Sequence, residues 1–238
     1  MGISLLIAVA LAAQPAAPSF DVVSVKPSPP GERFVMGPYP GGKFIASGIT
    51  PRILIQAAFQ LQDYQLSGLP GWAETEKFTI NAQAGHEITR DELRMMLRAL
   101  LSERFGLVMR HATHETNVFH LIVARGGAKL SAAAETEGRS GVSAQKGRMV
   151  GMAASMAQLA RALSQALGRP VFDQTGLDGK FDFSIEYTSA QSPGPEDASA
   201  EGSSLFAILE HQLGLKLEPA VGPGDFYGVI RISRPSEN

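Results

Sequence analysis

The sequence of 238 residues contains no cysteine, and this absence excludes several classes of protein at once. Disulfide bonds and thiolate metal sites are impossible, and so is a lipoprotein anchor, which needs a cysteine after its cleavage site. An exported protein without disulfides has to be held together by its hydrophobic core. That requirement suits a bacterial envelope better than a small disulfide-rich secreted domain.

Long hydrophobic runs are also missing. The run at 3–13 is about eleven residues long, whereas a helix that spans a bilayer takes about twenty. It ends in the small residues Ala10 and Ala12, as the apolar part of a secretory signal peptide does, although Met1-Gly2 brings no basic residue. We therefore expect a signal peptide at 1–13, export to the periplasm or the extracellular space, and no transmembrane segment in the mature chain.

Charge is scarce in both signs. Charged residues make up 18% of the chain and the formal net charge is −2, so the sequence offers no electrostatic attraction for nucleic acid or an anionic membrane. Hydrophobic residues make up 44%, which is typical of an ordinary soluble globular protein of one or two domains. We expect no nucleic-acid partner.

Signatures of catalysis are absent as well. The chain has no G-x-S-x-G, P-loop or G-x-G-x-x-G motif. His114-Glu115 followed by His120 does not have the H-E-x-x-H spacing, and the spacing of the acidic residues between 173 and 186 matches no calcium loop. We expect no catalytic residue and no cofactor.

What the chain does contain is an internal repeat. Gly42-Lys43-Phe44-Ile45 recurs 105 positions later as Gly147-Arg148-Met149-Val150, and Phe105-Gly106-Leu107 recurs 108 positions later as Leu213-Gly214-Leu215. The repeat predicts an α+β protein formed by tandem duplication of one module. The predicted order in each module is strand-helix-strand-strand-helix-strand-strand, with the helices packed on small sheets.

Local signals place several elements. Capping boxes at Thr89–Glu92 and Ser155–Gln158 predict helices that end at Gly106 and Gly168, and Thr50-Pro51 predicts a largely buried helix at 50–61. Segments 107–113 and 118–124 are expected to pair as a hairpin, and the alternating strand at 20–26 to add to a sheet edge. The predicted second strand pair is 216–219 and 226–233.

These elements divide the chain into four parts. They are a signal peptide at 1–13, an N-terminal strand with the first module at 20–125, a linker at 126–146, and a second module at 147–238. Residues 188–203 have the composition of a flexible insertion within the second module.

Several short runs resemble a known family. They include Ser24-Val25-Lys26-Pro27-Ser28, Pro70-Gly71-Trp72, Gly168-Arg169-Pro170-Val171 and Arg234-Pro235-Ser236-Glu237-Asn238. Together they resemble the soil-associated secreted protein family of bacteria, a domain of unknown function, over nearly the whole mature chain. The resemblance implies export and hints at sensing or binding, because similar domains are appended to membrane-bound sensor metallopeptidases. Where the family leads us to expect a glycine-containing turn, this chain has Ala153-Ala154. The element order, especially in the second half, also resembles the short N-terminal modules of secretins and TonB-dependent receptors.

Candidate site residues are few. If the hairpin turns at Glu115-Thr116, His111 and His120 become cross-strand neighbours that hold a zinc ion or sense pH; the alternative, which we favour, is surface histidines. The aromatic residues Trp72, Tyr64 and Tyr227 are candidates for binding a ligand. Trp72 corresponds in the repeat to Leu177, which favours a core role for it over a stacking platform.

The sequence thus predicts a non-catalytic envelope module for binding, sensing or protein interaction, whose partner is an envelope protein or a cell-wall component. Exposed strand edges, including the one expected at 226–232, would accept an added strand. The alternative is an envelope hydrolase with a site between the two modules.

Overall fold

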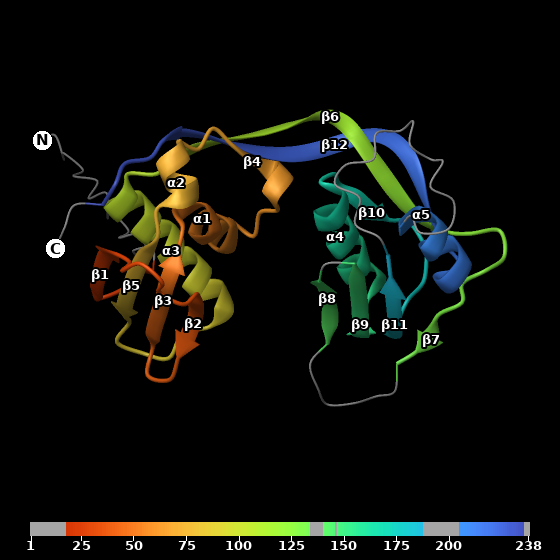
Figure 1. Cartoon of the computed structure of the whole chain (residues 1–238), viewed down its shortest axis with the longest axis horizontal. Coiled ribbons are helices and arrows are strands. Elements are labelled where there is room, and N and C mark those ends of the chain that lie inside the picture. The colour runs from red at the N-terminus through yellow and green to blue at the C-terminus, as the bar shows by residue number, and fades with distance from the viewer. Residues whose placement is uncertain (1–17, 134–139, 146, 188–204, 236–238) are drawn as a thin grey trace, which may run out of the picture. The chain divides into compact units, whose positions relative to one another are not determined.

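The computed structural model describes residues 18–133, 140–145, 147–187 and 205–235, so the predicted signal peptide and the insertion 188–203 lie outside the described residues (Figure 1). The chain divides into two compact units. The first takes residues up to 60, 69–108 and from 231 onward, and the second takes 61–68 and 109–230. Residues 61–68 and 109–125, which lie in the first predicted module, belong to the second unit in this division.

In its described residues, the first unit consists of one antiparallel sheet and three helices (Figure 1). The sheet order is β1-β5-β3-β2, with strands β1 (Val22–Pro27), β2 (Val35–Tyr39), β3 (Lys43–Ile49) and β5 (Phe78–Gln83). The strand predicted at 20–26 is β1, and it pairs with β5 at the sheet edge as expected. The helices are α1 (Pro51–Phe59), the short α2 (Gly71–Thr75) and α3 (Arg90–Phe105).

Local sequence signals fix both ends of α3. The Thr89 hydroxyl accepts a hydrogen bond from the Glu92 N–H at 3.2 Å, and the Glu92 carboxylate accepts one from the Thr89 N–H, which confirms the capping box. Gly106 ends the helix with φ 56°, a left-handed conformation that glycine adopts without strain. The helix brings Phe105 edge-to-face against Phe78 of β5, with ring centroids 5.6 Å apart, in the core of the unit.

Two further sheets lie in the second unit. One has the order β7-β11-β9-β8 and the other β10-β6-β12-β4. Their strands are β4 (Leu66–Ser67), β6 (Val108–Val123), β7 (Ser131–Ala132), β8 (Gly141–Gln145), β9 (Arg148–Ala154), β10 (Val171–Asp173), β11 (Phe181–Glu186) and β12 (Leu215–Arg231). The helices are a 3-10 turn η1 (Asp63–Gln65), α4 (Met156–Leu167), α5 (Leu205–Ile208) and a π-helical turn η2 (Leu209–Leu213).

The core of the second unit follows the predicted pattern. Helix α4 begins with the predicted capping box and ends at Gly168. It buries Leu159 and Leu163 against Met149 and Ile185 of the neighbouring sheet. In β11 the side chains alternate between buried and exposed, as the sequence predicts for a half-buried strand.

Two parallel pairings in the sheet β10-β6-β12-β4 join segments that are far apart in the chain. Leu66 of β4 lies opposite Tyr227 of β12, and Val171 of β10 lies opposite Phe119 of β6. Leu66 and Val171 occupy corresponding positions of the repeat, and so do Phe119 and Tyr227. A short strand from each half of the sequence therefore pairs with the long strand of the other half.

The hairpin predicted from 107–113 and 118–124 is wrong. These residues form the single strand β6, and the two strands predicted in the second half form the single strand β12. The segment 113–117 contains no glycine or proline to turn the chain and two β-branched threonines, so it continues as a strand. The edge predicted at 226–232 is also wrong, because β12 lies between β6 and β4. The predicted linker 126–146 contains β7 and β8.

Within the described ranges, no helix has both the length and the hydrophobicity needed to cross a membrane.

Candidate functional site

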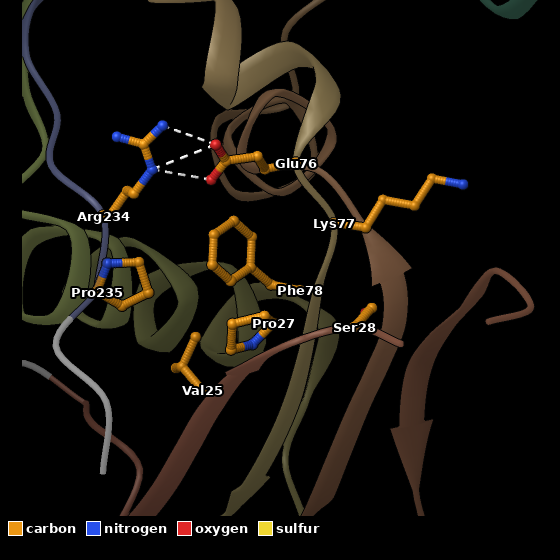
Figure 2. A pocket seen from close by; sticks show the side chains of 8 residues that line it. All are labelled: Val25, Pro27, Ser28, Glu76, Lys77, Phe78, Arg234 and Pro235. Carbon is orange, nitrogen blue, oxygen red and sulfur yellow. Dashed lines mark hydrogen bonds and ion pairs between the residues drawn. The ribbon is translucent and has the colours of Figure 1, made fainter. Parts of the chain in front are cut away.

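A pocket of about 340 Å³ opens in the first unit, where the C-terminal end of β1 meets the beginning of β5 and the last described residues of the chain (Figure 2). The residues that line it are Val25, Pro27, Ser28, Glu76, Lys77, Phe78, Arg234 and Pro235. The pocket therefore combines residues from both ends of the sequence. Neither composition nor spacing pointed to it.

The C-terminal segment is fixed at the pocket by Arg234. Its Nε donates to Glu76 Oε2 at 2.9 Å and its Nη2 donates to Glu76 Oε1 at 2.7 Å, which makes a bidentate ion pair (Figure 2). The hydrogen bonds from Arg234 lower the pKa of Glu76 and raise that of the guanidinium, so both groups are charged at neutral pH. One residue earlier, the Ser233 N–H donates to the Phe105 carbonyl at 2.7 Å.

Four of the eight lining residues are apolar: Val25, Pro27, Phe78 and Pro235. Val25 and Phe78 are buried. In the view of Figure 2, the Phe78 ring lies below the Glu76–Arg234 pair, with the Pro27 ring beneath it and the Pro235 ring to its left. The Lys77 side chain extends away from that ion pair. The Ser28 hydroxyl is engaged with Thr79 Oγ1 at 2.8 Å and with the Gly48 N–H at 3.2 Å. Such a lining accepts an apolar group and presents no activated nucleophile.

Trp72 stands beside this pocket, but its ring is already occupied. The Arg234 guanidinium lies over it at 5.0 Å from the ring centroid, and Phe78 meets it edge-on at 6.4 Å. A cation over an indole face is a favourable contact that supports the Arg234–Glu76 pair. Trp72 is half-buried and contacts two of the residues that line the pocket, Arg234 and Phe78.

The other two predicted binding residues belong to the second unit. The Tyr64 hydroxyl bonds to the Ser164 side chain, and burial raises the pKa of Tyr64. Ser164 is itself buried, donates to the Ala160 carbonyl and accepts from the Val171 N–H, both at 2.8 Å, so it joins α4 to β10. The Tyr227 ring is stacked on His111 with centroids 4.7 Å apart. Both tyrosines thus have internal partners.

His111 and His120 do not form the cross-strand pair that a turn at Glu115-Thr116 would have produced. His111 and His120 lie nine positions apart on one strand, β6, because the hairpin is absent. His111 Nε2 is 2.8 Å from Asp225 Oδ1, whereas His120 meets the ring of Phe172 edge-on. No group of three potential metal ligands occurs in the part of the chain that the structure describes.

No sequence motif pointed to Asp225, a residue of β12 whose carboxylate contacts two side chains of β6. Its Oδ1 accepts from Thr113 Oγ1 at 2.7 Å as well as facing His111. The hydrogen bond from Thr113, and then the one from His111, lower the pKa of Asp225. Because both partners meet the same carboxylate oxygen, the imidazole does not stand between the hydroxyl and the acid as it does in a catalytic triad. His114 is likewise stacked on Phe226, at 4.2 Å.

A family model described as "Protein of unknown function (DUF3738)" matches residues 52–232. No curated protein and no solved structure matches the chain.

Proposed function

Because this chain belongs to the family described as protein of unknown function (DUF3738), whose model spans most of it, we propose a function from its site: a non-catalytic binding module of the cell envelope. The observation that carries the proposal is the pocket of the first unit, where apolar side chains lie beside an ion pair, Glu76–Arg234, and a serine, Ser28, that are hydrogen-bonded within the protein. A catalytic site keeps acids, bases or nucleophiles directed at its substrate, whereas a binding pocket mainly excludes water from an apolar group.

The lining favours a protein segment as the ligand over a cell-wall fragment. A sugar needs many hydrogen-bond partners, and the Glu76 and Arg234 groups at this pocket are committed to each other. An apolar side chain needs only the surfaces of Val25, Pro27, Phe78 and Pro235. Burying such a side chain fully contributes about 1.5–3 kcal/mol, so one pocket gives a modest affinity that further contacts must increase.

The single tryptophan makes the proposal testable. Trp72 touches Phe78 and Arg234, so a ligand in the pocket should change its fluorescence. We suggest titrating the protein with a library of short peptides and with soluble cell-wall fragments. Pro27→Glu places a charge in the pocket and should abolish binding, whereas Pro29→Glu, at an exposed position outside the lining, should leave it intact.

Turnover of a library member by the unmodified protein would refute the non-catalytic role and restore the hydrolase alternative. A ligand whose affinity is the same in the Pro27→Glu and Pro29→Glu variants would refute the assignment of the binding site to this pocket.

Tandem duplication is part of the proposal. It is supported by the matching orders β1-β5-β3-β2 and β7-β11-β9-β8 and by the corresponding parallel pairings of β4 and β10. The helix-ending glycines Gly106 and Gly214 also correspond, with φ 56° and 63°. The likeness of each half to secretin modules and the soil-bacterial origin stay predictions.

Export is proposed on the apolar run at 3–13 alone. N-terminal sequencing of the secreted or periplasmic protein tests it. A mature protein that begins soon after residue 13 is the expected result, and one retained in the cytoplasm with its Met1 would refute export.

A further inference from the structure

Within the described residues, strand β8 is an open sheet edge, and its sequence contains no proline or charged residue that would block it. It is the last strand of the sheet β7-β11-β9-β8, and it pairs only with β9 among the described elements. Native proteins usually protect such edges with proline, charge or a covering segment, because unpaired N–H and C=O groups accept a further strand.

The ladder determines which groups of β8 point outward. The Tyr187 N–H donates to the Gly147 carbonyl at 2.7 Å, so Gly147 bonds toward β11. Hydrogen-bonded pairs alternate along an antiparallel ladder, and residues 149 and 151 of β9 therefore bond toward β11 as well. The alternate residues 148, 150 and 152 then bond toward β8, where they lie opposite 145, 143 and 141. The N–H and C=O groups of Val142 and Ala144 consequently face the open edge.

The corresponding strand of the first unit is blocked at this place. The Ala84 N–H donates to the Gly42 carbonyl, so residues 42, 44 and 46 bond toward β5 and residues 43, 45 and 47 bond toward β2. Residues 36 and 38 of β2 therefore face outward. Residue 38 is a proline, which has no N–H to offer. The register of β2 on β3 matches that of β8 on β9, so Pro38 and Ala144 are equivalent positions.

The opposite edge of the first sheet is blocked too. The Ser28 N–H donates to the Lys77 carbonyl, so Val23, Val25 and Pro27 of β1 face outward. Pro27 has no N–H, and the Arg104 guanidinium already donates to the Val23 carbonyl at 2.8 Å. Both edges of the first sheet are therefore protected by proline, and β8 is not.

We propose that β8 is a self-association edge, on which a second copy of this chain pairs antiparallel through its own β8. With Ser143 on the two-fold axis, Val142 of one copy lies opposite Ala144 of the other, and the reverse. Each of these two residue pairs exchanges two main-chain hydrogen bonds, which gives four bonds between the two copies. Because the two-fold axis uses the same edge on both copies, the assembly stops at a dimer. The proposal does not depend on the pocket or on its ligand.

The composition of β8 favours a second copy as the occupant. Gly141–Gln145 contains no charged residue, so two copies meet without like-charge repulsion across the axis. Ser143 and Ala144 are exposed and small, which permits close approach of two flat edges. Val142 is half-buried against the core of its own unit, which holds the strand in place. Because the strand is only five residues long, the dimer should be weak and concentration-dependent.

The absence of cysteine allows a sharp test. Residues on the axis of a non-hydrogen-bonded pair have Cα atoms about 4.5 Å apart, within the range that a disulfide spans. Ser143→Cys should therefore give a disulfide-linked dimer under mild oxidation. Gly37→Cys is the matched control at the equivalent position of the blocked strand β2, where an added Cβ meets no atom within 4 Å. We expect about ten-fold less linked dimer from it.

Exchange of the two equivalent residues completes the test. Ala144→Pro in the Ser143→Cys background should remove the cross-link, because proline has no N–H to donate. If that variant fails to fold, Ala144→Lys replaces it and should also remove the cross-link, because it brings two like charges to the contact. Pro38→Ala in the Gly37→Cys background should create a cross-link. Equal linking of Ser143→Cys and Gly37→Cys, or a Ser143→Cys protein that stays monomeric at high concentration, would overturn the proposal.

Discussion

The carboxylate of Asp182 accepts a hydrogen bond from the backbone N–H of Ala153 at 2.7 Å. Ala153 has φ 42°, a left-handed conformation that side chains with a Cβ rarely adopt. At the corresponding position of the first half stands Gly48, with φ 63°. The family pattern leads us to expect a glycine-containing turn here; Ala153 instead lies at an irregularity in strand β9, as Gly48 does in strand β3. Asp182 holds the strained residue in place.

Replacing Ala153 by glycine should therefore stabilise the protein. The substitution removes a left-handed strain of about 1–2 kcal/mol, and the greater freedom of glycine in the unfolded chain offsets about 0.4–1 kcal/mol of that gain. We expect a net increase of up to about 1.6 kcal/mol in the free energy of unfolding, measured by urea titration. Ala154→Gly is the control, because Ala154 is fully buried with an ordinary φ and should lose stability.

Gly151→Ala should destabilise the second unit. A Cβ added at Gly151 lies 2.3 Å from the ring of Phe183, so the ring has to leave its place in the core. Such overpacking costs about 1–3 kcal/mol. The matched substitution Gly37→Ala, where the added atom meets nothing within 4 Å, should change the urea midpoint little. A similar loss in both variants would contradict this account.

His86 and Glu92 predict a pH dependence. The hydrogen bond between them raises the pKa of His86 above 6.5 and lowers that of Glu92 below 4.5. The contribution of His86 is present below pH 6.5 and is lost as the pH rises through its raised pKa, whereas that of Glu92 is lost as the pH falls through its lowered pKa. Between about pH 6 and pH 8.5 the wild type should lose more stability than His86→Gln.

An NMR titration of the His86 ring provides the direct check. Its pKa should fall toward the ordinary histidine value in Glu92→Gln. An unchanged titration in that variant would show that Glu92 does not cause the shift.

Glu76 and Arg234 should act on Trp72 as one unit. Arg234→Gln removes the cation from the indole face, and Glu76→Gln weakens the ion pair that holds the Arg234 guanidinium over that face. Each single variant should shift the fluorescence maximum of Trp72, and the double variant should shift it no further than Arg234→Gln alone. Additive shifts would mean that the two residues influence the tryptophan independently.

A cut in the chain between 133 and 140 should not separate the two fragments. The fragment that ends before the cut contributes β4 and β6 to the second unit, and the other contributes β12 and β10, which pair with them. A protease site inserted there and cleaved should yield fragments that co-elute in gel filtration and separate only in denaturant. Fragments that separate in native buffer would contradict these pairings.

The sequence predicted what local chemistry decides. Capping boxes at Thr89 and Ser155, and the glycines that follow their helices, were correct because each depends on neighbours a few residues away. The hairpin failed because the course of β6 depends on its pairing with β12, which is remote in sequence. The pocket was unpredictable for the same reason, since Glu76 and Arg234 are 158 positions apart. Of the predicted binding residues, only Trp72 lies beside it.

The crossed pairings of β4 and β10 also have a consequence for the order of events during synthesis. Gln65 bonds to the Asp225 carbonyl, a partner 160 positions later, so the first half cannot complete its contacts until almost the entire chain has left the ribosome. Contacts of such long sequence separation slow folding, because the intervening chain must be ordered before they form. Strands β4 and β6 therefore stay without their partner strands until the C-terminal half has been made, whereas β1, β2, β3 and β5 can pair as soon as residue 83 has been added.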